Sequence, residues 1–87
     1  MRHDIAQFAE RMSATMDRKQ IERKELHKPH YTEESYTTGD ALVDMAAVQR
    51  RLERGIEARD AVYVRQMLVH IANFCMIVDA KIEKGKW

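Results

Sequence analysis

Three polar side chains, Gln66, His70 and Asn73, interrupt the most apolar stretch of the chain at steps of four and three residues. That spacing places them on one face of a helix. A buried polar group without a hydrogen-bond partner costs about 1 to 3 kcal/mol, so these groups must bond one another, a facing helix, water or a ligand. A polar layer that fixes helix register is the favoured interpretation from periodicity alone, and a ligand site is the alternative.

Arginine is concentrated at Arg50, Arg51 and Arg54, where guanidinium groups could bind phosphate directly. In a helix, Arg50 can instead pair with Glu53, and Arg54 can pair with Glu53 or Glu57. Two interpretations therefore stay open. The segment is either a phosphate-binding face or a solvated face of paired charges.

A third group of candidates, His27, Lys28, His30 and Tyr31, surrounds Pro29. These side chains can contact phosphate or stack on a base, although many surface loops have the same composition. The two histidines are a poor metal pair, because Pro29 breaks the helix that such a pair would need and no third ligand is evident. We therefore expect no zinc site here.

Covalent chemistry has little support in the sequence. Cys75 falls on an apolar helical stripe and is interpreted as a small core residue rather than a nucleophile. Ser13 and Ser35 have no evident base near them, and there is no glycine-rich phosphate loop. We expect no catalytic residues of this kind, no metal and no cofactor.

The overall composition limits the function classes further. The 87 residues and 10.2 kDa allow one small domain, and the net charge of +1 provides no global basic field for nucleic acid. The single Cys and the absence of a secretory apolar stretch at the start predict a cytoplasmic protein. Residues 67–78, the most apolar window, are too short to span a membrane and contain two polar side chains.

Apolar residues recur at helical spacing in three segments, which predicts a single all-α domain over residues 1–87. We expect helices at about 4–27, 39–58 and 60–84, with a connector at 29–38. The predicted start signals are Asp4 with Gln7, Thr37 with Asp40 (or Thr38 as the cap), and Asp60. The fold expected from these segments is a three-helix antiparallel bundle whose last two helices form a tight hairpin.

The third helix is apolar on most of its sides. One stripe comprises Val64, Leu68, Ile71, Cys75, Val78 and Ile82, and an adjacent stripe comprises Met67, Phe74 and Ile77. Three helices of this length cannot easily cover both stripes. We therefore expect a homo-oligomer in which the chains share a core.

The run Ile71-Ala72-Asn73-Phe74-Cys75-Met76 resembles the V-A-N-F-A-M run of MazG-like nucleotide pyrophosphohydrolases, especially small phage members that act on purine deoxynucleoside triphosphates. Residues 7–12 are similar to the amino-terminal helix of that family, and residues 26–31 are similar to its H-K-G-G-W connector. The resemblance implies an all-α fold, dimeric or larger, with E-E-x-x-E on one helix and E-x-x-D on the next holding Mg²⁺.

This chain departs from the family pattern at each metal-binding position. Ala47, Val48 and Arg51 stand at the E-E-x-x-E places, and Met67 and His70 stand at the E-x-x-D places. Without carboxylates the chain cannot form the oxygen-ligand cage that Mg²⁺ prefers. We therefore expect a protein that no longer binds the metal and that contacts phosphate directly through arginine side chains.

The leading hypothesis is a phage-encoded, catalytically inactive MazG-like protein in the host cytoplasm that binds a nucleotide or nucleotide-derived signal, with sequestration from a host defence system as one use. Its ligand residues would be Arg50, Arg51, Arg54, His27, Lys28, Tyr31, His70 and Asn73. An interaction protein that docks on a host or phage protein is the alternative. A residual pyrophosphohydrolase with a rebuilt site is the third possibility.

Overall fold

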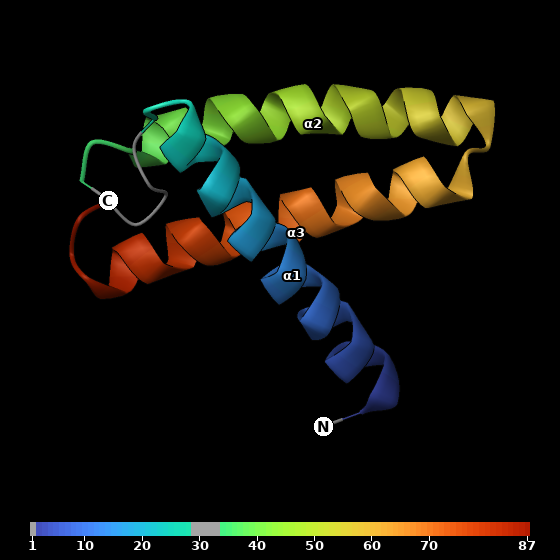
Figure 1. The fold of residues 1–87 in the computed structure, drawn as a ribbon, viewed down its shortest axis with the longest axis horizontal. Coiled ribbons are helices and arrows are strands. Elements are labelled where there is room, and N and C mark those ends of the chain that lie inside the picture. Colours follow the sequence, from blue (N-terminus) through green and yellow to red (C-terminus); the bar gives the residue numbers. More distant parts are fainter. Residues whose placement is uncertain (1, 29–33) are drawn as a thin grey trace.

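The computed structural model describes residues 2–28 and 34–87, and it is all-helical over these residues. The helices are α1 (His3–Glu25), α2 (Thr38–Ala58) and α3 (Ala61–Glu83). The three predicted helices are thus present, with no strand in the described part of the chain. Figure 1 shows α2 and α3 as an antiparallel hairpin that α1 crosses obliquely.

Two of the predicted helix starts have the expected chemistry. Thr37 Oγ1 accepts a hydrogen bond from Asp40 N at 3.1 Å, and Asp40 Oδ2 accepts one from Thr37 N at 2.9 Å, which forms a capping box for α2. Asp60 Oδ1 accepts from Tyr63 N at 3.1 Å and caps α3. The prediction of Asp4 as the N-cap of α1 was wrong. Arg2, two residues earlier, stands at that position, and its side chain forms no capping hydrogen bond.

The hairpin depends on close approach of its two helices near the turn. Gly55 is buried in α2, and a Cβ atom there would lie 3.0 Å from both Tyr63 Cδ1 and Val64 Cγ2. Arg59 takes a left-handed φ of 53°, which reverses the chain directly before the Asp60 cap. The neighbouring Ile56 lies on the outer side of this contact and is 58% exposed.

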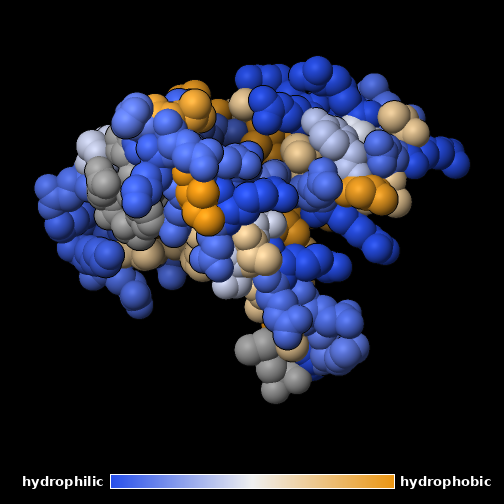
Figure 2. Space-filling model, in the orientation of Figure 1, coloured by the Kyte–Doolittle hydropathy of each residue, from blue (hydrophilic) through white to orange (hydrophobic). Residues whose placement is uncertain are grey.

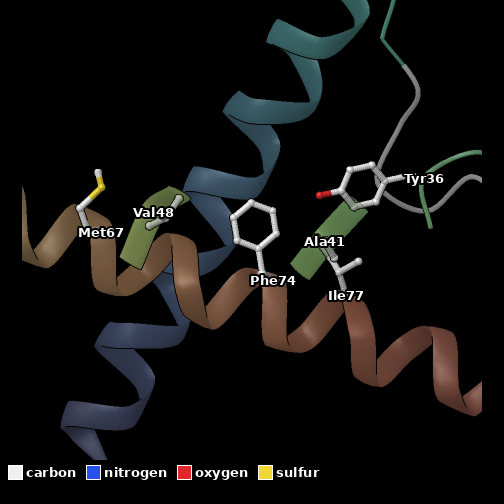
Figure 3. Packing of buried hydrophobic residues seen from close by; sticks show 6 residues of the cluster. All are labelled: Tyr36, Ala41, Val48, Met67, Phe74 and Ile77. Carbon is white, nitrogen blue, oxygen red and sulfur yellow. The ribbon is translucent and has the colours of Figure 1, made fainter. Parts of the chain in front are cut away.

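The core lies between α2 and the second apolar stripe of α3. Its buried cluster, shown in Figure 3, consists of Tyr36, Ala41, Val48, Met67, Phe74 and Ile77. In the first stripe Ile71 and Val78 pack against this core, but Leu68 is 42% exposed, Ile82 is 45% exposed and Cys75 is exposed. Since α2 packs on the other side of α3, the interpretation of Cys75 as a core residue is wrong for this chain.

The amino-terminal half of α1 extends beyond the hairpin (Figure 1). No α1 residue is buried, and a shallow groove on this arm is lined by Asp4, Ile5, Phe8, Ala9 and Met12. The face seen in Figure 2 is mostly hydrophilic, with separate apolar patches. An arm of this kind leaves apolar side chains in contact with water.

α3 is long and apolar enough to cross a membrane, with a mean hydropathy of 1.5 over its most apolar window, 28% of which is buried. The core helix of a water-soluble protein satisfies the same criteria of length and composition. The observation is therefore weak and assigns no location to the chain.

Candidate anion-binding cleft

A cleft of about 280 Å³ lies where the three helices converge. Lys19 and Lys28 line it from α1 and the turn that follows, and His70 and Phe74 line it from α3. The wall supplied by α2 consists of Asp44, Ala47, Val48 and Arg51. These four residues recur at steps of three, one and three, so they share one face of α2.

The turn after α1 determines where Lys28 lies. His27 takes a left-handed φ of 55°, its backbone N–H donates to Lys24 O at 3.1 Å, and the Lys28 N–H donates to Arg23 O at 2.8 Å. These two bonds form a Schellman motif, the common way in which a helix ends. The exposed His27 side chain is thus at a capping position, outside the residues that line the cleft.

The cleft has a positive local charge. Lys19, Lys28 and Arg51 contribute three cations, and Asp44 is the one acidic side chain among the described lining residues. Asp44 Oδ2 accepts a hydrogen bond from the Tyr36 hydroxyl at 2.6 Å, and the Arg23 guanidinium lies 5.0 Å from the Tyr36 ring centroid. An anion in the cleft would meet cations from α1, α2 and the turn after α1 together.

Burial and the nearby cations both act on the pKa of His70. Burial lowers the pKa of His70 below its usual 6.5, and the positive charges of Lys19, Arg18 and Arg51 lower it further, while Glu22 acts in the opposite direction. The imidazole is therefore neutral at pH 7 and can both donate and accept a hydrogen bond. A bound anion would offset the cations and raise the pKa again.

Asn73 lies beside the cleft with one unused hydrogen-bonding atom. Its side chain is 5% exposed, and Nδ2 donates to Met12 O at 3.1 Å. Oδ1 is buried and has no hydrogen-bond partner among the described residues. Asn73 lines a cavity of about 10 Å³, and His70 and Phe74 line both this cavity and the cleft. The space is close to the minimum for one water molecule.

The predicted ligand residues fall into three groups. Lys28, Arg51 and His70 line the cleft, and Asn73 lies next to it. His27, Arg50 and Arg54 are exposed and do not line it. Tyr31, together with His30, lies outside the described residues. Gln66 is also exposed, so the predicted polar line is limited to His70 and Asn73 in this chain.

Sequence reasoning missed Lys19, Asp44 and Phe74 as cleft residues. Asp44 could have been found, because it stands seven residues before Arg51, two helical turns away on the same face. Lys19 could not, because its place depends on the angle at which α1 crosses α3. Among the described residues, no three His, Cys, Asp or Glu side chains form a group that could hold a metal ion.

Comparisons with family models, with curated proteins and with solved structures give no match to this chain.

Proposed function

We propose that this chain is a MazG-like protein that binds a nucleotide or nucleotide-derived signal in the three-helix cleft without hydrolysing it. One observation carries the proposal. Of the five positions at which the resemblance implies metal-binding carboxylates, Ala47, Val48, Arg51 and His70 line one cleft, and two lysines join them there. Arg51, together with Lys19 and Lys28, provides direct positive charge for phosphate in place of a bridging metal.

The cleft offers complementary groups for each part of a nucleotide. Arg51, Lys19 and Lys28 suit the phosphate oxygens, with the planar guanidinium giving a two-pronged contact. The Asp44 carboxylate can accept from a sugar hydroxyl or an exocyclic amine, and the edge of the core at Phe74 forms the apolar part of the wall. The free Asn73 Oδ1 needs a donor, which a ligand N–H or a bound water would supply.

The proposal includes a cytoplasmic location, because nucleotides and nucleotide signals are found there, and sequestration from a host defence system as the biological use. Sequestration needs affinity but no turnover. Asp44 is the single acidic side chain that residues 2–28 and 34–87 contribute to the cleft, which supports binding without metal-dependent hydrolysis.

The direct test is calorimetric titration with dATP and dGTP, with and without Mg²⁺, beside an assay for pyrophosphate release. We expect saturable binding that does not require Mg²⁺, and no release of pyrophosphate. Tripolyphosphate and deoxyadenosine separate the contributions of phosphate and base. Metal-dependent pyrophosphate release that scales with protein concentration would contradict the proposal, and Asp44 would then be the first residue to examine as a replacement ligand.

Self-association is part of the same proposal. Leu68 and Ile82 are 42% and 45% exposed on one helix, which leaves apolar surface in contact with water in a single copy. We infer that a second copy covers it. Sedimentation at micromolar protein should give a mass above 10.2 kDa, and Leu68→Glu should reduce it, whereas Val62→Glu at the hairpin tip should not. A wild-type monomer would contradict this inference.

A protein-docking function is the second candidate, and the projecting α1 arm favours it. Phe8 and Met12, which are half-buried, line one groove of the arm together with Ile5, which is 51% exposed. Amphipathic helices with exposed apolar side chains commonly dock in grooves of other proteins. If Ile5→Glu leaves nucleotide binding intact but abolishes the protein's effect on a host, docking is the function that matters.

A further inference from the structure

A second pocket, separate from the anion-binding cleft, lies between α1 and the carboxy-terminal part of α3. Its volume is about 220 Å³, and apolar side chains form much of its wall: Met16 from α1, and Met76, Ile77 and Ala80 from α3. A cavity of about 150 Å³ lined by apolar side chains is enough to bind benzene. The pocket therefore has room for a short hydrocarbon chain or one substituted ring.

The same pocket carries a concentration of lysine. Lys81, Lys84 and Lys86 line it, and Glu34 is the one acidic side chain that the described residues contribute to its lining. Lys81 is 8% exposed, so the aliphatic part of this side chain is packed in the protein, and its charge acts on Glu34. With Lys81 left aside, Lys84 and Lys86 still outnumber Glu34 among the described lining residues, which leaves positive charge beside an apolar wall.

The end of α3 holds Lys86 in place. Gly85 adopts a left-handed φ of 68°, and the Lys86 N–H donates to Lys81 O at 2.9 Å, so the chain turns back at this point. The Lys86 ammonium then forms an ion pair with Glu34. The carboxy-terminal tail thus contributes one wall of the pocket, and Trp87 follows directly.

We propose that this pocket binds a small organic anion with an apolar body, of the class of medium-chain carboxylates. The hydrocarbon part packs against Met16, Met76 and Ile77, and the carboxylate lies between Lys84 and Lys86, where it shares or replaces the contact of Glu34. Methionine side chains adapt to ligands of different shape, which suits an apolar chain. A neutral hydrocarbon would leave the lysines unused, and a free phosphate would leave the apolar wall in water.

This site is independent of the proposed nucleotide function, because none of its charged residues lines the anion-binding cleft. The two ligand classes also differ. The cleft presents a guanidinium beside a histidine and suits phosphate, whereas the pocket presents flexible ammonium groups over an apolar wall. Failure of one proposal therefore leaves the other standing.

The test is a titration of the full chain, labelled at its methionine methyl groups, with octanoate below its micellar concentration and observed by NMR. The Met16 and Met76 methyl signals should shift saturably, while those of Met45 and Met67, on the α2 side of α3, should not. Octanol should bind at least about threefold more weakly than octanoate, and added salt should remove this difference. Acetate should cause no saturable shift.

Lysine variants distinguish binding at a charged site from nonspecific hydrophobic binding. The double variant Lys84→Gln with Lys86→Gln should weaken octanoate binding at least about threefold and leave octanol binding unchanged. Lys24→Gln, an exposed lysine of α1 that does not line the pocket, is the matched control and should bind like the wild type. Equal binding of octanol and octanoate, unchanged binding by the double variant, or equal shifts at all the methionines would each overturn the proposal.

Discussion

Asn73 of α3 donates a hydrogen bond from Nδ2 to the backbone carbonyl of Met12 in α1, at 3.1 Å. The bond joins residues 61 positions apart in the sequence and fixes where α1 crosses α3. It also explains the orientation of the amide, since Oδ1 is left beside the small cavity next to the anion-binding cleft. Asn73 thus positions α1, the helix that places Lys19 at the cleft, and its Oδ1 atom can still accept a hydrogen bond.

Replacing Asn73 with Ala should lower the free energy of unfolding by about 1 kcal/mol, because the hydrogen bond to Met12 is lost together with an unsatisfied acceptor. Urea denaturation followed by circular dichroism measures this change. The matched control is Gln66→Ala, an exposed residue of the same helix, which should change stability by less than about 0.5 kcal/mol. Equal effects of the two variants would show that the bond to Met12 contributes nothing.

The stability of the protein should fall as the pH drops below the usual pKa of histidine, 6.5. The native state lowers the pKa of His70, so the unfolded chain binds the proton more readily over the range between the two values. Above that range both states are neutral and the contribution to pH dependence disappears. His70→Gln should flatten this part of the stability profile. Bound tripolyphosphate should oppose the effect in the wild type, since an anion raises the pKa of His70.

Replacing Arg51 with Ala should weaken nucleotide binding at least about tenfold, because a charge-assisted hydrogen bond contributes about 1.5 to 3 kcal/mol. Thermal stability should stay within a few degrees, as Arg51 is exposed. Arg50→Ala and Arg54→Ala are matched controls on the same helix, and calorimetry should show little change for either. If all three variants bind like the wild type, the arginines form a solvated face and protein docking becomes the leading function.

His27→Gly should raise the free energy of unfolding by up to about 1 kcal/mol, since glycine adopts the left-handed conformation without steric strain. Nucleotide affinity should remain within about twofold, because His27 does not line the cleft. Chemical denaturation and titration of the same preparation give both values. A large loss of nucleotide affinity would instead show that the His27 imidazole contacts the ligand.

Local signals in the sequence were sufficient to predict the three helices. The capping pairs at Thr37 and Asp60 and the helical spacing of apolar residues depend only on near neighbours, so the three helices are predictable. Tertiary packing is where prediction failed. Leu68 and Cys75 lie on an apolar stripe as regular as that of Met67 and Phe74, and only the position of α2 decides which stripe is buried.

The same distinction applies to the anion-binding cleft. Arg51, His70 and Asn73 stood out because a charge or a polar group interrupts a local pattern in each case. Lys19 gives no such signal, since it is one of several cations on a charged part of α1. Its approach to His70 results from the crossing of two helices far apart in the sequence.

The turn at Arg59 and Asp60 makes the contacts between α2 and α3 near it local in sequence, whereas the hydrogen bond between α1 and α3 joins residues 61 positions apart. Local contacts form with less loss of chain entropy, so the hairpin should assemble early and α1 should dock on it late. Lys19 joins the rest of the cleft only in that late step. A ligand that requires Lys19 therefore favours the docked state, and hydrogen exchange in α1 should slow on binding more than exchange in the hairpin.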